Sequence, residues 1–244
     1  MADSAPKKIL FIDIETVAGA RKFDELDPIW QKLWSKKAVS LSGGNEEVDA
    51  AEMYENRAAI YSEFGKVIVI GLGYFAFNED KSVELRVTSL SSNDEHQLLT
   101  SFQKLMEQKF NQGYFLCAHN GKEFDYPYLC RRMTIHGISL PDILRLEGKK
   151  PWEVPHLDTM EMWKYGDRKS FTSLQLLTTV LGIPSPKDDI DGSMVNEVYY
   201  GTGDIDRIAR YCKNDVVATA QVFLRLHQQP TIPKDKILFV DFNE

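Results

Sequence analysis

The sequence predicts an α/β fold in which a mixed central β-sheet carries α-helices on its faces. Three strand-like segments come first, at residues 8–17, 67–77 and 83–89. Segments with helical and strand-like patterns then alternate through the rest of the chain. With 43% apolar residues among 244, the chain can also bury a sizeable core. Neighbouring strands followed by alternating helices and strands are typical of a mixed sheet covered by helices.

The first three strands are predicted from apolar runs and from alternation of apolar and polar residues. Gly71 and Gly73 interrupt the second strand, which indicates either a bulge or the close approach of another element. Residues 78–82 carry Asn, Asp and Ser and predict a hairpin turn between the second and third strands.

Residues 18–66 separate the first two strands and are expected to form a helical insertion. Their pattern predicts helices at about 25–37 and 48–63, joined by a loop at 42–45. Trp30 and Trp34 lie on one face of the first helix and are expected to pack the insertion onto the core, or to form a stacking platform for single-stranded nucleic acid. We expect one domain over residues 1–244 that includes this insertion.

The rest of the chain should supply the remaining strands and most of the helices. Ser92 and Glu95 predict a capping box at the start of a helix that ends near Phe110. Gly137 is a typical helix stop. The other expected elements are strands at 114–118 and 156–158 and helices at 125–136, 173–181 and 204–227.

Charge and composition exclude several classes of protein. A net charge of −7 has the wrong sign for a protein that coats nucleic acid non-specifically. Three cysteines without close spacing argue against a disulfide framework and a structural zinc site. No apolar run approaches the roughly 18 residues that span a bilayer, and the first residues do not resemble a signal peptide. We therefore expect a cytoplasmic protein without a membrane partner.

Acidic residues from three distant segments predict a metal site. Asp13 and Glu15 lie two residues apart on a predicted strand and therefore share a face. Tyr211 and Asp215 lie four residues apart on a predicted helix and also share a face. A third segment supplies Asp125. Four converging carboxylates repel one another unless divalent metal is present, so the pattern suggests a two-metal site for phosphodiester cleavage.

These acids lie in three motifs that resemble those of the DEDD superfamily of 3′–5′ exonucleases, which have a ribonuclease-H-like fold. The likeness is greatest to the proofreading exonuclease domain of family B DNA polymerases, and it covers residues 8–17 and 67–227. The motifs in this chain are Asp13-Ile14-Glu15-Thr16, then Asn120-x-x-x-Phe124-Asp125-x-Pro127-Tyr128-Leu129-x-x-Arg132, and finally Tyr211-Cys212-x-x-Asp215.

The third motif resembles that of the tyrosine subclass. Tyr211 stands four residues before Asp215, whereas the position five residues before, where the histidine subclass carries His, holds Arg210. Only a few dozen residues follow the motifs, so no polymerase domain fits and we expect a stand-alone exonuclease.

The resemblance also implies a role for each motif residue. Asp13 would bridge two Mg²⁺ or Mn²⁺ ions, Glu15 and Asp215 would complete the ligands of one ion, and Asp125 would hold the second. Tyr211 would orient the attacking water, because a phenol with a pKa of about 10 is a poor base at neutral pH. The residues expected to approach the substrate are Ile14, Thr16, Asn120 and Phe124.

The expected function is metal-dependent 3′–5′ hydrolysis of single-stranded DNA with release of nucleoside monophosphates. The alternatives are a 3′–5′ exoribonuclease and a catalytically weak nucleic-acid-binding module. The implied partner is single-stranded nucleic acid, with DNA favoured over RNA, and the sequence identifies no polymerase or repair partner.

Other polar residues near the motifs have simpler interpretations. We expect a structural role for His119, and the N-cap of a helix for Asp158. The basic cluster of Lys164, Arg168 and Lys169 suits contacts with phosphates and a solvated helix end equally well.

Overall fold

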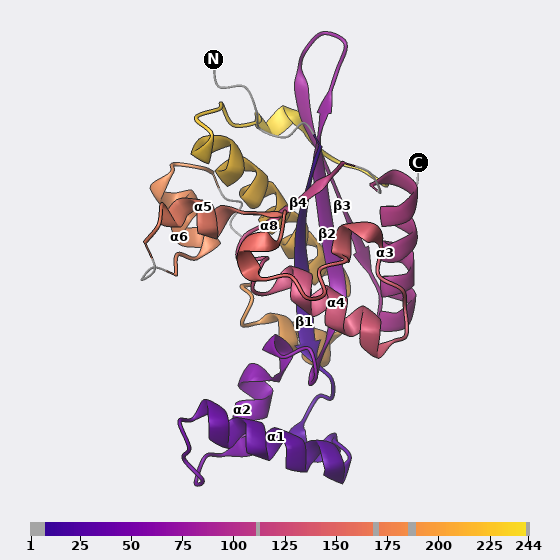
Figure 1. Cartoon of the computed structure of the whole chain (residues 1–244), viewed down its shortest axis with the longest axis vertical. Helices are drawn as coiled ribbons and strands as arrows, with labels where there is room; N and C mark the ends of the chain where they lie inside the picture. The colour runs from indigo at the N-terminus through magenta and orange to yellow at the C-terminus, as the bar shows by residue number, and fades with distance from the viewer. Residues whose placement is uncertain (1–7, 111–112, 168–170, 185–188, 243–244) are drawn as a thin grey trace.

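The computed structural model describes residues 8–110, 113–167, 171–184 and 189–242. Within these residues one six-stranded sheet has the order β5-β4-β1-β2-β3-β6 and carries helices on both faces (Figure 1). The pairs β1–β2 and β2–β3 are antiparallel. The pairs β1–β4, β4–β5 and β3–β6 are parallel. The predicted mixed sheet is therefore confirmed. Its strands are β1 (Ile9–Ala18), β2 (Gly65–Phe77), β3 (Val83–Ser91), β4 (Phe115–Ala118), β5 (Leu157–Asp158) and β6 (Ile237–Phe239).

The helices follow the predicted order, with additions that the sequence did not reveal. The described helices are α1 (Pro28–Leu41), α2 (Ala50–Arg57), α3 (Glu95–Lys109), α4 (Asp125–Ile135), α5 (Thr159–Lys164), α6 (Leu174–Val180), α7 (Val195–Thr202) and α8 (Ile205–Leu226). The helix α7 and the strand β6 were not predicted, whereas α5 begins after Asp158, where the sequence predicted a capped helix. The expected helix at 48–63 is shorter, because α2 ends at Arg57 and a 3-10 turn, Ala58–Ile60, follows.

Strand β1 lies in the middle of the sheet, and its alternating side chains serve two separate cores. Leu10, Ile12 and Ile14 face a cluster built from α3 and α4. Ile9 and Phe11 face a second cluster that includes side chains of α8. Because successive side chains on a strand point to opposite faces, the odd-numbered residues of β1 face α8.

Helix α8 can approach the sheet closely because two positions of β2 lack a side chain. A Cβ on Gly71 would lie 2.8 Å from Cys212 Sγ, and one on Gly73 would lie 2.7 Å from Val216 Cγ1. The two glycines therefore mark a close approach. The register irregularity of this strand pair lies elsewhere, where Glu15 and Thr16 of β1 pair with Val69 and Val67 of β2 and one residue of β2 is skipped.

The insertion between β1 and β2 packs around one tryptophan beyond the end of the sheet (Figure 1). Trp34 is fully buried, and its ring lies 4.9 Å from that of Phe64 and 5.3 Å from that of Tyr54. Trp30 remains 42% exposed and touches Phe64 with its ring edge. The packing role predicted for both tryptophans is thus clear for Trp34 and partial for Trp30.

The predicted capping box at the start of α3 is wrong. Asp94 is the N-cap, and its side chain accepts a hydrogen bond from Gln97 N. Ser92 Oγ instead accepts from Asp94 N. Glu95 points into the protein, where it pairs with Arg132 of α4. The sequence pattern of a capping box was present, but burying Glu95 in an ion pair determined the geometry.

No helix among the described residues combines the length and the apolar character needed to cross a membrane.

Candidate active site

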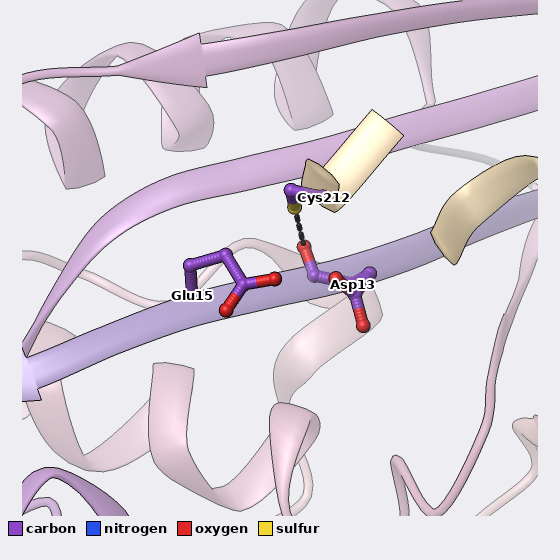
Figure 2. Close-up of side chains that lie close together, drawn as sticks. All are labelled: Asp13, Glu15 and Cys212. Carbon is purple, nitrogen blue, oxygen red and sulfur yellow. Dashed lines mark hydrogen bonds between the residues drawn. The ribbon is translucent and has the colours of Figure 1, made fainter. Parts of the chain in front are cut away.

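Asp13 and Glu15 share one face of β1, as their spacing predicted, and α8 packs on that face. Ligand atoms of Asp13, Glu15 and Cys212 all lie within 4.8 Å of one another (Figure 2). The Cys212 thiol donates to the Asp13 main-chain oxygen at 3.4 Å, and burial raises the pKa of this thiol. Cys212 therefore ties α8 to β1 as a neutral thiol. Glu15 is buried and Asp13 is half-buried.

Asp125 approaches Asp13 from the edge of β1 that is no longer paired with β4. Pairing between β1 and β4 ends at Phe11 and Cys117, so the later main-chain groups on that edge of β1 lack a strand partner. Ile14 N donates to Asp125 Oδ1 at 3.1 Å instead. Asp125 is the first residue of α4, where the helix dipole favours a carboxylate. One hydrogen bond thus satisfies the strand and fixes the acid.

Helix α8 supplies the remaining two predicted residues. Tyr211 and Asp215 lie one turn apart, and their side chains are hydrogen-bonded to each other. Burial raises the pKa of the Tyr211 phenol, and the charges of Asp215, Glu15 and Asp13 raise it further. The phenol therefore keeps its proton at neutral pH and can donate a hydrogen bond.

The charges within this cluster are acidic and act on one another. Burial raises the pKa of Asp13 well above its usual range, and the charges of Glu15, Asp215 and Asp125 add to the effect. The pKa of Glu15 is raised for the same reasons. Burial raises the pKa of Asp125 to about 7, although its hydrogen bond from Ile14 N favours the charged form. Four carboxylates thus share one poorly solvated place.

This donor set fits divalent cations. Asp13 Oδ2 is buried and has no hydrogen-bond partner in the described part of the chain, so a ligand position on it is open. Carboxylate oxygens are the ligands that Mg²⁺ and Mn²⁺ prefer. A bound cation would also offset the repulsion that raises these pKa values.

The turn before α4 carries the amide side chain of Asn120. Asn120 adopts a left-handed conformation with φ +67°, which asparagine tolerates better than most residues. Asp158 holds the turn, because its carboxylate accepts from Asn120 N at 3.0 Å and from Lys122 N at 3.1 Å. Asn120 Oδ1 is buried and has no partner among the described residues. The turn therefore presents an unused acceptor.

The other residues expected near the substrate have different surroundings. The Ile14 side chain is 5% exposed and packs in the core on the face away from Asp13 and Glu15. Thr16 Oγ1 donates to Ala59 O at 2.9 Å and so joins β1 to the insertion. Phe124 is half-buried with its ring 5.3 Å from that of Tyr128.

The structural roles expected for His119 and Asp158 agree with their contacts. His119 bonds to Thr159 Oγ1 and Thr172 O, and burial lowers the pKa of its ring. Asp158 caps α5 by accepting from Met160 N and Glu161 N. The sequence suggested this cap but gave no sign that the same carboxylate also holds the Asn120 turn. Arg168 and Lys169 of the basic cluster lie outside the described residues.

The chain is similar to known proteins in sequence and in fold. Residues 60–232 match a family described as "Predicted 3'-5' exonuclease related to the exonuclease domain of PolB". Among solved structures, the chain is similar to the family B DNA polymerase from the hyperthermophilic archaeon Pyrobaculum calidifontis, with a TM-score of 0.55 and 16% identity. The match covers 92% of this chain and 25% of the polymerase, so this chain spans about a quarter of that protein. The likeness confirms the predicted ribonuclease-H-like α/β fold.

Proposed function

Because the chain belongs to the family of predicted 3′–5′ exonucleases related to the exonuclease domain of PolB, we propose that it hydrolyses single-stranded DNA from the 3′ end. The products would be nucleoside monophosphates. The observation that carries the proposal is the meeting of Asp13, Glu15, Asp125 and Asp215 with the phenol of Tyr211. These groups come from three segments that lie far apart in the sequence.

The proposed metal ligands are the four carboxylates, and Asp13 is the central one. The charges of the other three acids each raise the pKa of Asp13. Its buried Oδ2 has no hydrogen-bond partner among the described residues. Two Mg²⁺ or Mn²⁺ ions bound there would activate water and stabilise charge on the leaving 3′ oxygen. Asp13 is half-buried, whereas Glu15 and Asp125 are buried.

The role proposed for Tyr211 is to orient the attacking water. The raised pKa of the phenol excludes it as a base at neutral pH, but the protonated hydroxyl can donate a hydrogen bond. Its bond to Asp215 keeps the hydroxyl beside the acids. Tyr211 would therefore contribute geometry and not proton abstraction.

The turn at Asn120 and the ring of Phe124 would bind the terminal nucleotides. The unpartnered Asn120 Oδ1 can accept a hydrogen bond from a base or sugar. Phe124 keeps part of its ring accessible at the start of α4, where it could stack on a base. Main-chain atoms of Ile14 and the half-buried Thr16 would complete this surface.

A gel time course tests the proposal directly. DNA and RNA oligonucleotides of the same sequence, labelled at the 5′ end, are incubated with Mg²⁺, with Mn²⁺ or with EDTA. The variant Asp13→Asn removes the central acid, and Asp206→Asn makes the same charge change at an exposed position of α8. We expect a ladder that shortens from the 3′ end in metal, that persists in Asp206→Asn and disappears in Asp13→Asn.

The outcomes separate the proposal from its alternatives. Faster shortening of RNA than of DNA would identify an exoribonuclease with the same carboxylates. Tight binding of oligonucleotide without cleavage in either metal would favour a binding module. Equal activity of Asp13→Asn and the unmodified protein would show that the metal ligands are assigned wrongly.

A further inference from the structure

We infer that Lys66 and Tyr199 form a subsite that binds a phosphate of the single-stranded substrate upstream of the scissile bond. The inference rests on the proposed function and adds a contact outside the five motif residues. Lys66 lies near the start of β2, and Tyr199 lies on α7, a helix that the sequence motifs do not include.

Sheet register places Lys66 on the same face as the catalytic acids. Lys66 pairs with Val17 on the neighbouring strand, and Val17 lies two residues beyond Glu15. Val17 packs with side chains of α7 and α8, so this side of the pair continues the face that carries Asp13 and Glu15. Two residues of strand span about 7 Å, so the main chain of Val17, opposite Lys66, lies about that far beyond Glu15 along the same face.

The Lys66 ammonium is held by aromatic side chains. Its Nζ lies 3.2 Å from the Tyr199 hydroxyl, 4.9 Å from the centre of the Tyr199 ring and 5.8 Å from that of Tyr200. Ring faces attract an ammonium without neutralising it. The ion pairs found between described residues do not include Lys66. A half-buried positive charge is thus oriented and still able to bind an anion.

Helix α7 is fixed to the end of β1, which gives the subsite a defined position. Ala18 N donates to Asn196 Oδ1 at 2.9 Å, and the Tyr200 hydroxyl donates to Ala18 O at 2.6 Å. These bonds hold Tyr199 against Lys66. A preorganised ammonium binds phosphate with less loss of side-chain freedom than a mobile lysine on the surface.

Charge complementarity selects a polyanion as the ligand. The chain carries a net charge of −7, and the neighbouring cluster is acidic, so a nucleic-acid strand needs local cations to approach. Lys66 can provide one such cation on the face of the sheet that carries the acids. The competing explanation is that Lys66 only attaches α7 to β2, in which case its removal would change stability and leave binding of nucleic acid unchanged.

The test measures binding without cleavage. A 5′-fluorescein-labelled dT12 is titrated by anisotropy in EDTA at several salt concentrations, with every variant built on Asp13→Asn to keep the oligonucleotide intact. Lys66→Met is compared with Lys37→Met, because Lys37 is also half-buried and lies 4.5 Å over a tyrosine ring, that of Tyr61, on the insertion. Thermal unfolding of each variant is recorded in parallel.

We expect Lys66→Met to bind about 5- to 10-fold more weakly, with a salt slope smaller by about 0.7, as for the loss of one phosphate contact on a single strand. Lys66→Arg should bind almost as the parent does, and Tyr199→Phe should lose less than Lys66→Met. Unchanged affinity and slope in Lys66→Met, or an equal loss in Lys37→Met, would overturn the inference. The same holds if the parent binds no dT12.

Failure of the inference and failure of the proposed function give different results. If the unmodified protein cleaves DNA and Lys66→Met binds dT12 as tightly as its parent, the exonuclease assignment stands and the subsite is rejected. If Lys66→Met weakens binding of dT12 but the unmodified protein cleaves neither DNA nor RNA, the subsite stands and the proposed activity is rejected.

Discussion

The buried ion pair between Glu95 and Arg132 should be a large contributor to stability. Arg132 contacts the Glu95 carboxylate through Nε at 2.9 Å and Nη2 at 2.5 Å, and Nη1 donates to Ser62 O at 2.8 Å. Only 6% of the Glu95 side chain is exposed. This pair connects α3, the end of the insertion and α4, which begins with Asp125. Replacing Arg132 by methionine leaves a buried carboxylate without its main cation.

The expected loss follows from what Glu95 retains. Removing one partner of a buried ion pair costs about 3–5 kcal/mol. Glu95 still accepts from Val67 N at 2.7 Å and from His136 Nε2 at 2.8 Å, so we expect a loss near the lower limit. A loss of about 3 kcal/mol corresponds to a fall of roughly 6–12 °C in Tm for a domain of this size. Arg131→Met, at the exposed neighbouring position, should change stability by less than about 0.5 kcal/mol.

The loss should depend on pH in a defined direction. Burial alone would raise the pKa of Glu95, but the Arg132 guanidinium and the Val67 N–H hold it below its ordinary value. In the unmodified protein this stabilisation is present at neutral pH and is lost as pH falls through the lowered pKa. In Arg132→Met burial should instead raise the pKa of Glu95, so protonation relieves the penalty and the difference from the unmodified protein shrinks between pH 7 and pH 5.

Urea unfolding in EDTA at pH 7 and pH 5 measures this difference. Arg132→Met, Arg131→Met and the double variant Glu95→Gln/Arg132→Met are each compared with the unmodified protein at the same pH. The double variant should lose less than the sum of its single variants, because it leaves no buried charge. A loss below about 1 kcal/mol for Arg132→Met at pH 7, or a loss that grows on acidification, would refute the reasoning.

Three further substitutions test the candidate active site. Asp13→Ala should abolish cleavage. It should also raise the Tm in EDTA, because the raised pKa of Asp13 means that the ionised carboxylate destabilises the metal-free fold. A lower Tm in calorimetry would contradict this. Tyr211→Phe should lower kcat by less than about 100-fold and keep the rise in Tm that Mg²⁺ gives the unmodified protein, whereas complete loss of that rise would make Tyr211 part of the metal site. Gly71→Ala would bring its Cβ within 2.8 Å of Cys212 Sγ and 2.9 Å of Val216 Cγ2. It should cost about 1–3 kcal/mol in urea unfolding and reduce cleavage, and normal values for both would show that α8 has room to move.

Local periodicity explains why much of the site could be predicted from sequence. Asp13 and Glu15 share a face because a strand repeats every two residues, and Tyr211 and Asp215 share a face because a helix repeats every 3.6. The structure brings both pairs together with Asp125. Each pattern needs only the type of its own element, and the order of the three motifs then indicates that the elements meet.

Interactions between distant segments could not be read in this way. Asp125 is fixed by Ile14 N only because β4 stops early and leaves that edge of β1 unpaired. Asp158 holds the Asn120 turn 38 residues away, although its sequence context indicates only a helix cap. Glu95 has the spacing of a capping residue, yet its partner Arg132 lies 37 residues further along. In each case the deciding partner depends on tertiary structure.

The site concentrates features that each oppose folding. Burial and repulsion raise the pKa values of Asp13, Glu15 and Asp125. Asp13 Oδ2 and Asn120 Oδ1 are buried without partners among the described residues, and Asn120 has a positive φ. A neutral residue in place of Asp13 would relieve part of this repulsion. The surrounding contacts, above all Asp158 on the turn and Cys212 on β1, nevertheless hold these groups together. Such an arrangement is stable only with compensation, and divalent cations would supply it by neutralising the acids that they bind. On this argument, metal binding and stability of the site are coupled, so added Mg²⁺ should stabilise the unmodified protein most at a pH where all four acids are ionised.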